Sequence, residues 1–200
     1  MCDHASAGAP KRILFYNSVA DRLITLLNSD VGNFFSYLKL RPKVLDPFTY
    51  NDIFDGSVWK WFDKNKPVGS TLIGIQMCWD GAQVFDPTSK SMWPILWSII
   101  NFPPELRDKP FLGLHMASLD TCSIAAIQVF VDELQQLWDI GFNVNGRHYV
   151  VALIEIICDG RGREKIKKVQ GGGSSIAGCH ICDFKGYSFA KRIVFRRWQR

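Results

Sequence analysis

The stretch that decides the fold runs from Leu72 to Glu105 and reads LIGIQMCWDGAQVFDPTSKSMWPILWSIINFPPE. An apolar run from Leu72 to Trp79 ends on Asp80, and after a polar turn a second apolar run extends from Met92 to Phe102. Short apolar runs separated by a turn are typical of two strands that form a hairpin. The sequence therefore predicts a buried strand that carries a carboxylate, that of Asp80, at its C-terminal end.

Asp80 has two interpretations. Asp-Gly is a common turn pair, so Asp80 can be a cap or turn residue after the strand. A carboxylate in this position can also be the first member of an acidic cluster that binds a metal ion. A second acid at the end of a neighbouring strand would favour the metal interpretation.

Such an acid follows the run from Tyr149 to Cys158, YVVALIEIIC, which is typical of a central strand buried on both faces. This run ends on Asp159, which is again followed by glycine. If the two strands lie side by side, the carboxylates of Asp80 and Asp159 converge. Paired carboxylates suit Mg²⁺ or Mn²⁺, which can activate a water or a 3′-hydroxyl for phosphodiester cleavage. The alternative, in which both acids are turn residues, stays open.

The remaining chain supplies the other elements of an α/β domain. We expect, in chain order, two helical pieces within Lys11–Leu40, irregular chain from Arg41, a loop over Lys64–Ser70, a third strand over Phe111–Met116, a helix over Ile124–Trp138 and a basic helix over Arg161–Val169. On the Ile124–Trp138 helix, Ile127, Val131, Leu134 and Trp138 share one face. The predicted organisation is an N-terminal helical and irregular region (1–66), a core (67–170), and a Gly-Ser linker with a Cys-x2-Cys element and a basic tail (171–200).

Composition indicates a folded protein with a basic end. Hydrophobic residues make up 47% and charged residues 22% of the chain, which allows a sizeable core and excludes a disordered tail. The net charge is +5, but the segment from Asp159 to Arg200 holds eleven lysines and arginines against three acids, a net charge of +8. This end suits a polyanion such as nucleic acid, or it is a solvated surface. The DNA-binding candidates are Arg161, Arg163, Lys165, Lys167, Lys168, Lys191, Arg192, Arg196 and Arg197.

The cysteines and the N-terminus bear on the compartment. No signal-peptide pattern precedes the six cysteines, whose spacing favours free thiols over a disulfide framework. The apolar run Trp93–Phe102 is too short to span a bilayer. We therefore expect an intracellular protein that is not bound to a membrane.

One cysteine pair has metal-binding spacing. Cys179 and Cys182 form a C-x2-C pair, which lets two thiolates share one tetrahedral Zn²⁺. A single pair supplies half of a structural site, so an unmetallated thiol pair is the alternative.

Several short motifs occur together in a fixed order. They are Trp79-Asp80-Gly81, Ser89-Lys90, Trp93-Pro94-Ile95-Leu96, Pro103-Pro104-Glu105-Leu106-Arg107, Phe130-Val131-Asp132-Glu133-Leu134, Cys158-Asp159, Gly178-Cys179-His180-Ile181-Cys182 and Arg192-Ile193-Val194-Phe195. In this order and spacing the chain resembles the catalytic region of CACTA-type (En/Spm-like) transposases, in their animal branch. These belong to the DDE transposases, whose core is RNase H-like.

The resemblance implies an RNase H-like mixed sheet flanked by helices, with N-terminal helices and a C-terminal Cys-containing insertion. Asp80 and Asp159 would be the first two catalytic acids and would bind Mg²⁺ or Mn²⁺ for DNA cleavage and strand transfer at transposon ends. It also implies a nuclear location and DNA as the partner, and it allows a homo-oligomer.

Such enzymes need a third carboxylate on a later helix. The only acid after Cys182 is Asp183, so we expect a partial or degenerate copy of the catalytic region. The alternative function is that of a non-catalytic DNA- or protein-binding remnant.

Overall fold

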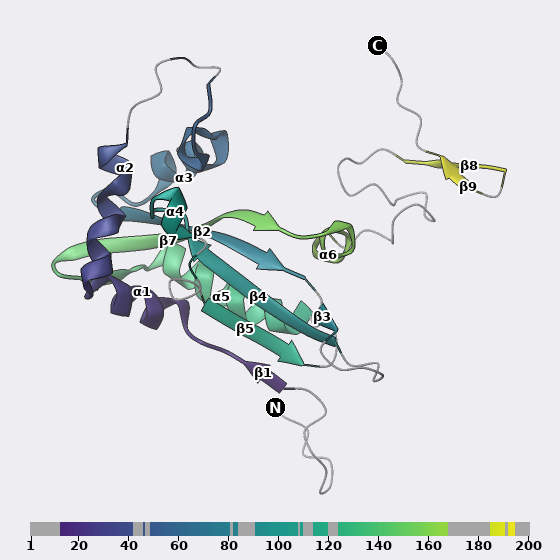
Figure 1. Ribbon diagram of the computed structural model, residues 1–200, viewed down its shortest axis with the longest axis horizontal. Helices are drawn as coiled ribbons and strands as arrows, with labels where there is room; N and C mark the ends of the chain where they lie inside the picture. Colours follow the sequence, from purple (N-terminus) through teal and green to yellow (C-terminus); the bar gives the residue numbers. More distant parts are fainter. Residues whose placement is uncertain are drawn as a thin grey trace, which may run out of the picture. The chain divides into compact units, whose positions relative to one another are not determined.

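The computed structural model describes residues 13–41, 46, 49–80, 82–83, 91–107, 109, 114–119, 124–167, 185–190 and 192–194. The chain forms two compact units, Met1–Ile156 and Ile157–Arg200. The first unit is a mixed α/β structure in which helices flank a curled sheet of parallel and antiparallel strands (Figure 1). The α/β class predicted from the sequence is confirmed.

The elements of the first unit, in chain order, are β1 (Ile13–Phe15), α1 (Val19–Leu27), the 3-10 helix η1 (Asp30–Ser36), α2 (Tyr37–Leu40), the 3-10 helix η2 (Ile53–Asp55), α3 (Ser57–Asn65), β2 (Thr71–Trp79), β3 (Ala82–Gln83), β4 (Ser91–Ile99), α4 (Pro104–Arg107), β5 (Leu114–Leu119), α5 (Ile124–Asp139), β6 (Phe142–Val144) and β7 (Arg147–Ile157). The second unit contains α6 (Gly160–Ile166), β8 (Tyr187–Phe189) and β9 (Arg192–Val194).

The sheet has the strand order β1-β5-β4-β2-β7-β6, and β3 pairs with β4. The predicted hairpin is confirmed, because β2 and β4 pair antiparallel from Ile75 opposite Ile99 to Trp79 opposite Ile95. On its other side β2 neighbours β7, and both strands run in the same direction in Figure 1. The two strands that precede Asp80 and Asp159 are therefore neighbours in one sheet, which is the condition that the metal interpretation of the two acids set.

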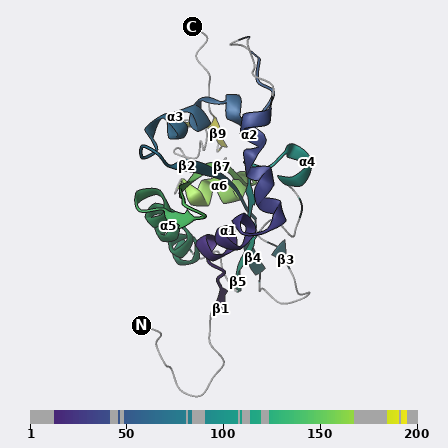
Figure 2. The ribbon, with the colours of Figure 1, turned by 90° about the vertical axis from the view of Figure 1, so that its left-hand side faces the viewer.

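Burial explains the apolar sequence of the two central strands. Ile73, Ile75 and Met77 of β2 are fully enclosed, and so are Val150 and Val151 of β7. A strand that is covered on both faces has no solvent side, so it shows a continuous apolar run in place of alternation. The prediction that Tyr149–Cys158 is buried on both faces is wrong for the end of β7, where Ile156 and Ile157 are 39% and 43% exposed. In both views α5 lies along one face of the sheet (Figures 1 and 2).

The predicted helix Ile124–Trp138 exists as α5, but its predicted core face is partly wrong. Val131, assigned to the core, is 41% exposed, whereas Phe130 and Leu137 are buried together with Leu134. The buried residues at positions 130, 134 and 137 keep the helical spacing of four and three. The buried face of α5 is therefore displaced from the predicted one, and it includes Phe130 in place of Val131.

Two predictions for the N-terminal region are wrong in detail. Ile13–Phe15 is a strand that pairs antiparallel with β5, and it is not part of a helix. The segment Ser57–Asn65, within the region predicted to be irregular or a loop, is the helix α3, which buries Trp59 against Phe54 with ring centroids 4.6 Å apart. The two helical pieces predicted within Lys11–Leu40 are observed as α1 and as η1 with α2.

A side chain continues the pairing of β2 with β4 after β4 ends at Ile99. The Asn101 amide, which is 3% exposed, accepts from the Gly74 backbone N–H (2.8 Å) and donates to the Leu72 carbonyl (2.9 Å). The Ile100 N–H donates to the Gly74 carbonyl (3.0 Å). Asn101 thus satisfies two buried backbone groups of β2 and fixes the start of the strand that leads to Asp80.

Candidate functional site

The first predicted acid lies where the sequence places it. Asp80 is the first residue after β2 and is exposed, whereas the preceding Trp79 is 1% exposed. Trp79 packs against Trp93 of β4, with ring centroids 5.1 Å apart. The packing of the buried Trp79 against the half-buried Trp93 fixes the end of β2, and Asp80 follows at the boundary with solvent.

The second predicted acid is the N-cap of α6. The Asp159 Oδ1 atom accepts from the Gly162 backbone N–H at 2.5 Å, and Asp159 has the extended backbone of a cap residue, with φ −66° and ψ 178°. An acceptor at this position satisfies one of the N–H groups that the first turn leaves unpaired. Asp159 is therefore a helix cap, a role that the two sequence-based interpretations of this residue, a turn residue and a metal ligand, did not name. The cap occupies one of its two carboxylate oxygens.

Asp80 and Asp159 offer carboxylate oxygens as ligands for a divalent metal ion. Among the described residues there is no group of three or more histidines, cysteines or acids that could hold a metal ion. Asp80 belongs to the first unit and Asp159 to the second. Two aspartates fit Mg²⁺, which keeps several waters and is commonly bound through one or two carboxylates plus the phosphates of a substrate. A structural zinc cage would need more ligands than this.

The predicted DNA-binding residues that the structure describes lie on α6 and β9. The side chains of Arg163 and Lys165 on α6 are exposed, and so are those of Lys167, the C-cap of α6, and Arg192 on β9. Arg163 also donates to the Cys158 carbonyl (3.2 Å). Arg161 lies on α6, but its side chain is outside the described part of the chain. Lys168, Cys179, Cys182, Lys191, Arg196 and Arg197 also lie outside the described residues, so the zinc prediction is not tested.

Sequence reasoning missed a buried ion-pair network next to the sheet. Arg41 donates to both carboxylate oxygens of Asp55 (2.8 and 2.7 Å), and Arg107 pairs with both oxygens of Asp52 (2.9 Å each). Both guanidinium groups lie over the ring of Phe54, 5.6 and 5.3 Å from its centroid. The network holds η2 and α4 together, although these elements are far apart in the sequence.

The electrostatics of the network follow from its hydrogen bonds. The Arg41 guanidinium is the main reason that the pKa of Asp55 lies below its ordinary value, and it outweighs the burial that acts against ionisation. The backbone N–H groups of Asn51 and Asp52 also donate to Asp55 (3.0 Å each). Burial, aided by the neighbouring Asp52 carboxylate, raises the pKa of the Tyr37 hydroxyl. These groups are satisfied by one another, so we assign the network a structural role.

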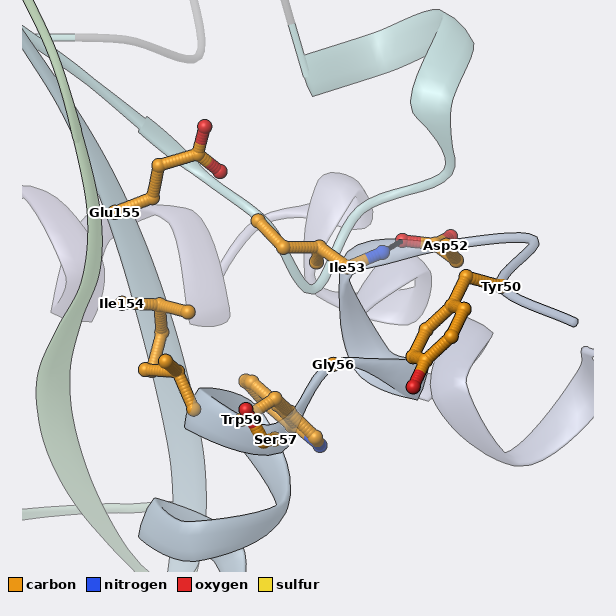
Figure 3. Close-up of a pocket in the computed structure, with 9 residues that line it drawn as sticks. Tyr50, Asp52, Ile53, Gly56, Ser57, Trp59, Ile154 and Glu155 are labelled. Atoms are coloured by element: carbon orange, nitrogen blue, oxygen red, sulfur yellow. Dashed lines mark hydrogen bonds between the residues drawn. The ribbon is translucent and has the colours of Figure 1, made fainter. Parts of the chain in front are cut away.

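A pocket of about 410 Å³ lies beside this network (Figure 3). Its walls come from η2 and α3 on one side, with Trp59 and Ser57, and from β7 on the other side, with Ile154 and Glu155. Tyr50 stands at the rim and is 66% exposed. None of these residues was predicted as a site, because η2 and α3 were expected to be irregular chain.

A second polar cluster joins α5 to the start of α1. The Glu133 carboxylate accepts from the Ser18 hydroxyl (2.8 Å), from the backbone N–H groups of Val19 (3.0 Å) and Ala20 (3.2 Å), and from the Tyr16 hydroxyl. Burial and the hydrogen bond to Glu133 raise the pKa of the Tyr16 hydroxyl. A carboxylate at a helix N-terminus is favoured by the helix dipole. Glu133, part of a motif quoted for the resemblance, therefore anchors α1.

The comparisons with known proteins give no family. No protein-family model matches the chain, and no curated protein or solved structure matches it. In the described part of the chain, no helix is long and apolar enough to cross a membrane.

Proposed function

We propose that the chain is the RNase H-like core of a DDE-type transposase, in which Asp80 and Asp159 together bind Mg²⁺ or Mn²⁺ for DNA cleavage. One observation carries the proposal: β2 and β7 are neighbours in the sheet, and an aspartate follows each strand, Asp80 directly after β2 and Asp159 two residues after β7 ends at Ile157. With the short strands β1, β3 and β6 left aside, the order in the sheet is β5-β4-β2-β7. In chain order the first long strand is β2 and the fourth is β7, and these two are adjacent. This is the adjacency that an RNase H-like sheet requires.

In this proposal the two aspartates bind the metal ion and the basic residues near α6 contact DNA. Asp80 and the second oxygen of Asp159 supply hard anionic ligands, and the hydrogen bond from Gly162 fixes the Asp159 carboxylate. A bound divalent ion supplies charge neutralisation and an activated water or 3′-hydroxyl. The exposed basic residues Arg163 and Lys165 of α6, with its C-cap Lys167, can neutralise the phosphates of a DNA backbone. In this proposal the partner is DNA at transposon ends and the location is the nucleus.

Nicking of supercoiled DNA with Mg²⁺ or Mn²⁺ tests the proposal. Asp80→Asn and Asp159→Asn remove the negative charges, and asparagine at 159 keeps a good N-cap, so α6 is retained. Asp139→Asn is the matched control, because Asp139 is an exposed acid at the end of α5. We expect both strand-end variants to lose nicking and the control to keep it. Nicking that is indifferent to both variants contradicts the proposal.

The second candidate is a non-catalytic DNA- or protein-binding remnant of a transposase. The cap role of Asp159 favours it, because that role alone accounts for an aspartate at this position. This candidate predicts DNA binding that falls with salt, is lost on truncation after Gly178 and is unchanged by Asp80→Asn. Divalent-metal binding that depends on Asp80 decides against it.

A further inference from the structure

The β8–β9 hairpin presents two aromatic rings and an arginine on one face. β8 and β9 pair antiparallel with Tyr187 opposite Val194 and Phe189 opposite Arg192. Side chains alternate along a strand and directly opposed residues share a face, so these four side chains lie together. The strand reversal begins at Ala190, whose φ of +48° is the left-handed conformation that a two-residue hairpin turn needs.

The rings on this face are exposed. Phe189 is 65% and Tyr187 is 45% exposed, and the side chain of Arg192 is exposed beside them. A two-stranded hairpin is marginally stable in water, so apolar rings on its surface do not serve a core of their own. Two adjacent aromatic side chains on a solvent face are typical of a binding surface.

Charge decides which partner fits this face. From Lys185 to Arg200 the sequence contains six lysines and arginines and no acid. Lys185 and Arg192, which the structure describes, are both exposed. A positive surface with aromatic rings is what proteins use to bind single-stranded nucleic acid, in which bases stack on the rings and phosphates pair with the cations. A duplex offers the charge but keeps its bases stacked within the helix.

We propose that this hairpin face binds unpaired nucleotides, with Tyr187 and Phe189 stacking on bases and Lys185 and Arg192 neutralising phosphates. The proposal rests on the DNA-binding part of the proposed function and does not involve its acids. It adds a preference for single strands, such as the strand ends that DNA cleavage exposes. Because the rings are already exposed, their removal does not disturb a folded core.

Fluorescence anisotropy with labelled oligodeoxythymidylate, and with a duplex of equal length, tests the proposal on the full chain. Base stacking on one ring corresponds to roughly a 5- to 150-fold change in affinity. We therefore expect Phe189→Ala and Tyr187→Ala each to weaken binding of the single strand within this range. Neither variant should change binding of the duplex much. Tyr50→Ala is the matched control, because Tyr50 is 66% exposed in the first unit. Phe189→Leu keeps an apolar side chain without a ring and should weaken binding as Phe189→Ala does.

The role of charge has its own readout. Arg192→Gln should weaken binding and reduce the slope of log affinity against log salt by about 0.7, the value for one phosphate of a single strand. The proposal is overturned if the wild type does not bind the single strand, or if it binds with no loss in Phe189→Ala and Tyr187→Ala. Asp80→Asn should bind the single strand as the wild type does. Loss of the nicking proposal therefore leaves the single-strand-binding proposal intact, and loss of single-strand binding leaves the nicking proposal intact.

Discussion

Replacement of Asn101 should cost more stability than any other change to a single amide in the described chain. In Asn101→Ala the Gly74 N–H and the Leu72 carbonyl lose their partners inside the protein. Each buried backbone group left unpaired costs about 1–3 kcal/mol, so we expect a loss of about 2–6 kcal/mol in the free energy of unfolding. Since small domains are stable by only about 5–15 kcal/mol, this change should lower the urea midpoint by a large fraction.

Urea unfolding followed by tryptophan fluorescence measures this loss, because the chain has seven tryptophans. Asn65→Ala is the matched control: the Asn65 amide also donates to a carbonyl, that of Trp61 (2.7 Å), but it is exposed. We expect the control to change stability by no more than about 0.5 kcal/mol. Equal effects of the two substitutions would refute the assignment of Asn101 as the buried link between β4 and β2.

Two further predictions concern the packing around η2 and α3. Gly74→Ala should destabilise the protein by about 1–3 kcal/mol in urea unfolding, because its Cβ would lie 2.5 Å from Ile100 and 2.7 Å from Trp59; a variant as stable as the wild type would contradict this packing. Asp55→Ala leaves the part-buried Arg41 guanidinium without its partner and should cost about 1–3 kcal/mol. Because the pKa of Asp55 is lowered, its contribution is complete above about pH 4 and is lost as the pH falls through the lowered value. The difference in the free energy of unfolding between wild type and Asp55→Ala, measured by urea unfolding across pH, should therefore be constant from neutral pH to about pH 4 and shrink only below it. A difference that shrinks at higher pH would be inconsistent with the ion pair.

The sequence predicts the centre of the sheet well, because its physical signal is local. The apolar runs that become β2, β4 and β7 are long, and most of their residues are buried, but the end of β7 is not: Ile156 and Ile157 are 39% and 43% exposed. The hairpin β6–β7 was missed although Asn145-Gly146 is a strong local signal for it. Both residues have positive φ, 50° and 73°, as a tight hairpin turn requires.

Other parts could not be predicted because their causes lie far apart in the chain. The helix α3 has nine residues and buries only Trp59 fully; its apolar side chains do share one face, but the segment is shorter than the window over which a helical period can be recognised. The pairing of Asp52 with Arg107 joins residues 55 positions apart, and no local pattern indicates it. For Asp159 the residue was predicted correctly as a strand-end acid. Its cap role depends on the helix that follows, whereas the sequence alternatives for it were a turn residue and a metal ligand.

The most direct test of the proposed function is a double-variant cycle on Mn²⁺ affinity, measured by titration calorimetry. If Asp80 and Asp159 hold the same ion, either Asp→Asn change should weaken binding strongly, and the double variant should bind little more weakly than the worse single variant. Asp139→Asn should leave the affinity unchanged. Effects that simply add in the double variant, or Mn²⁺ binding that is indifferent to both acids, would contradict a shared metal site at the ends of β2 and β7.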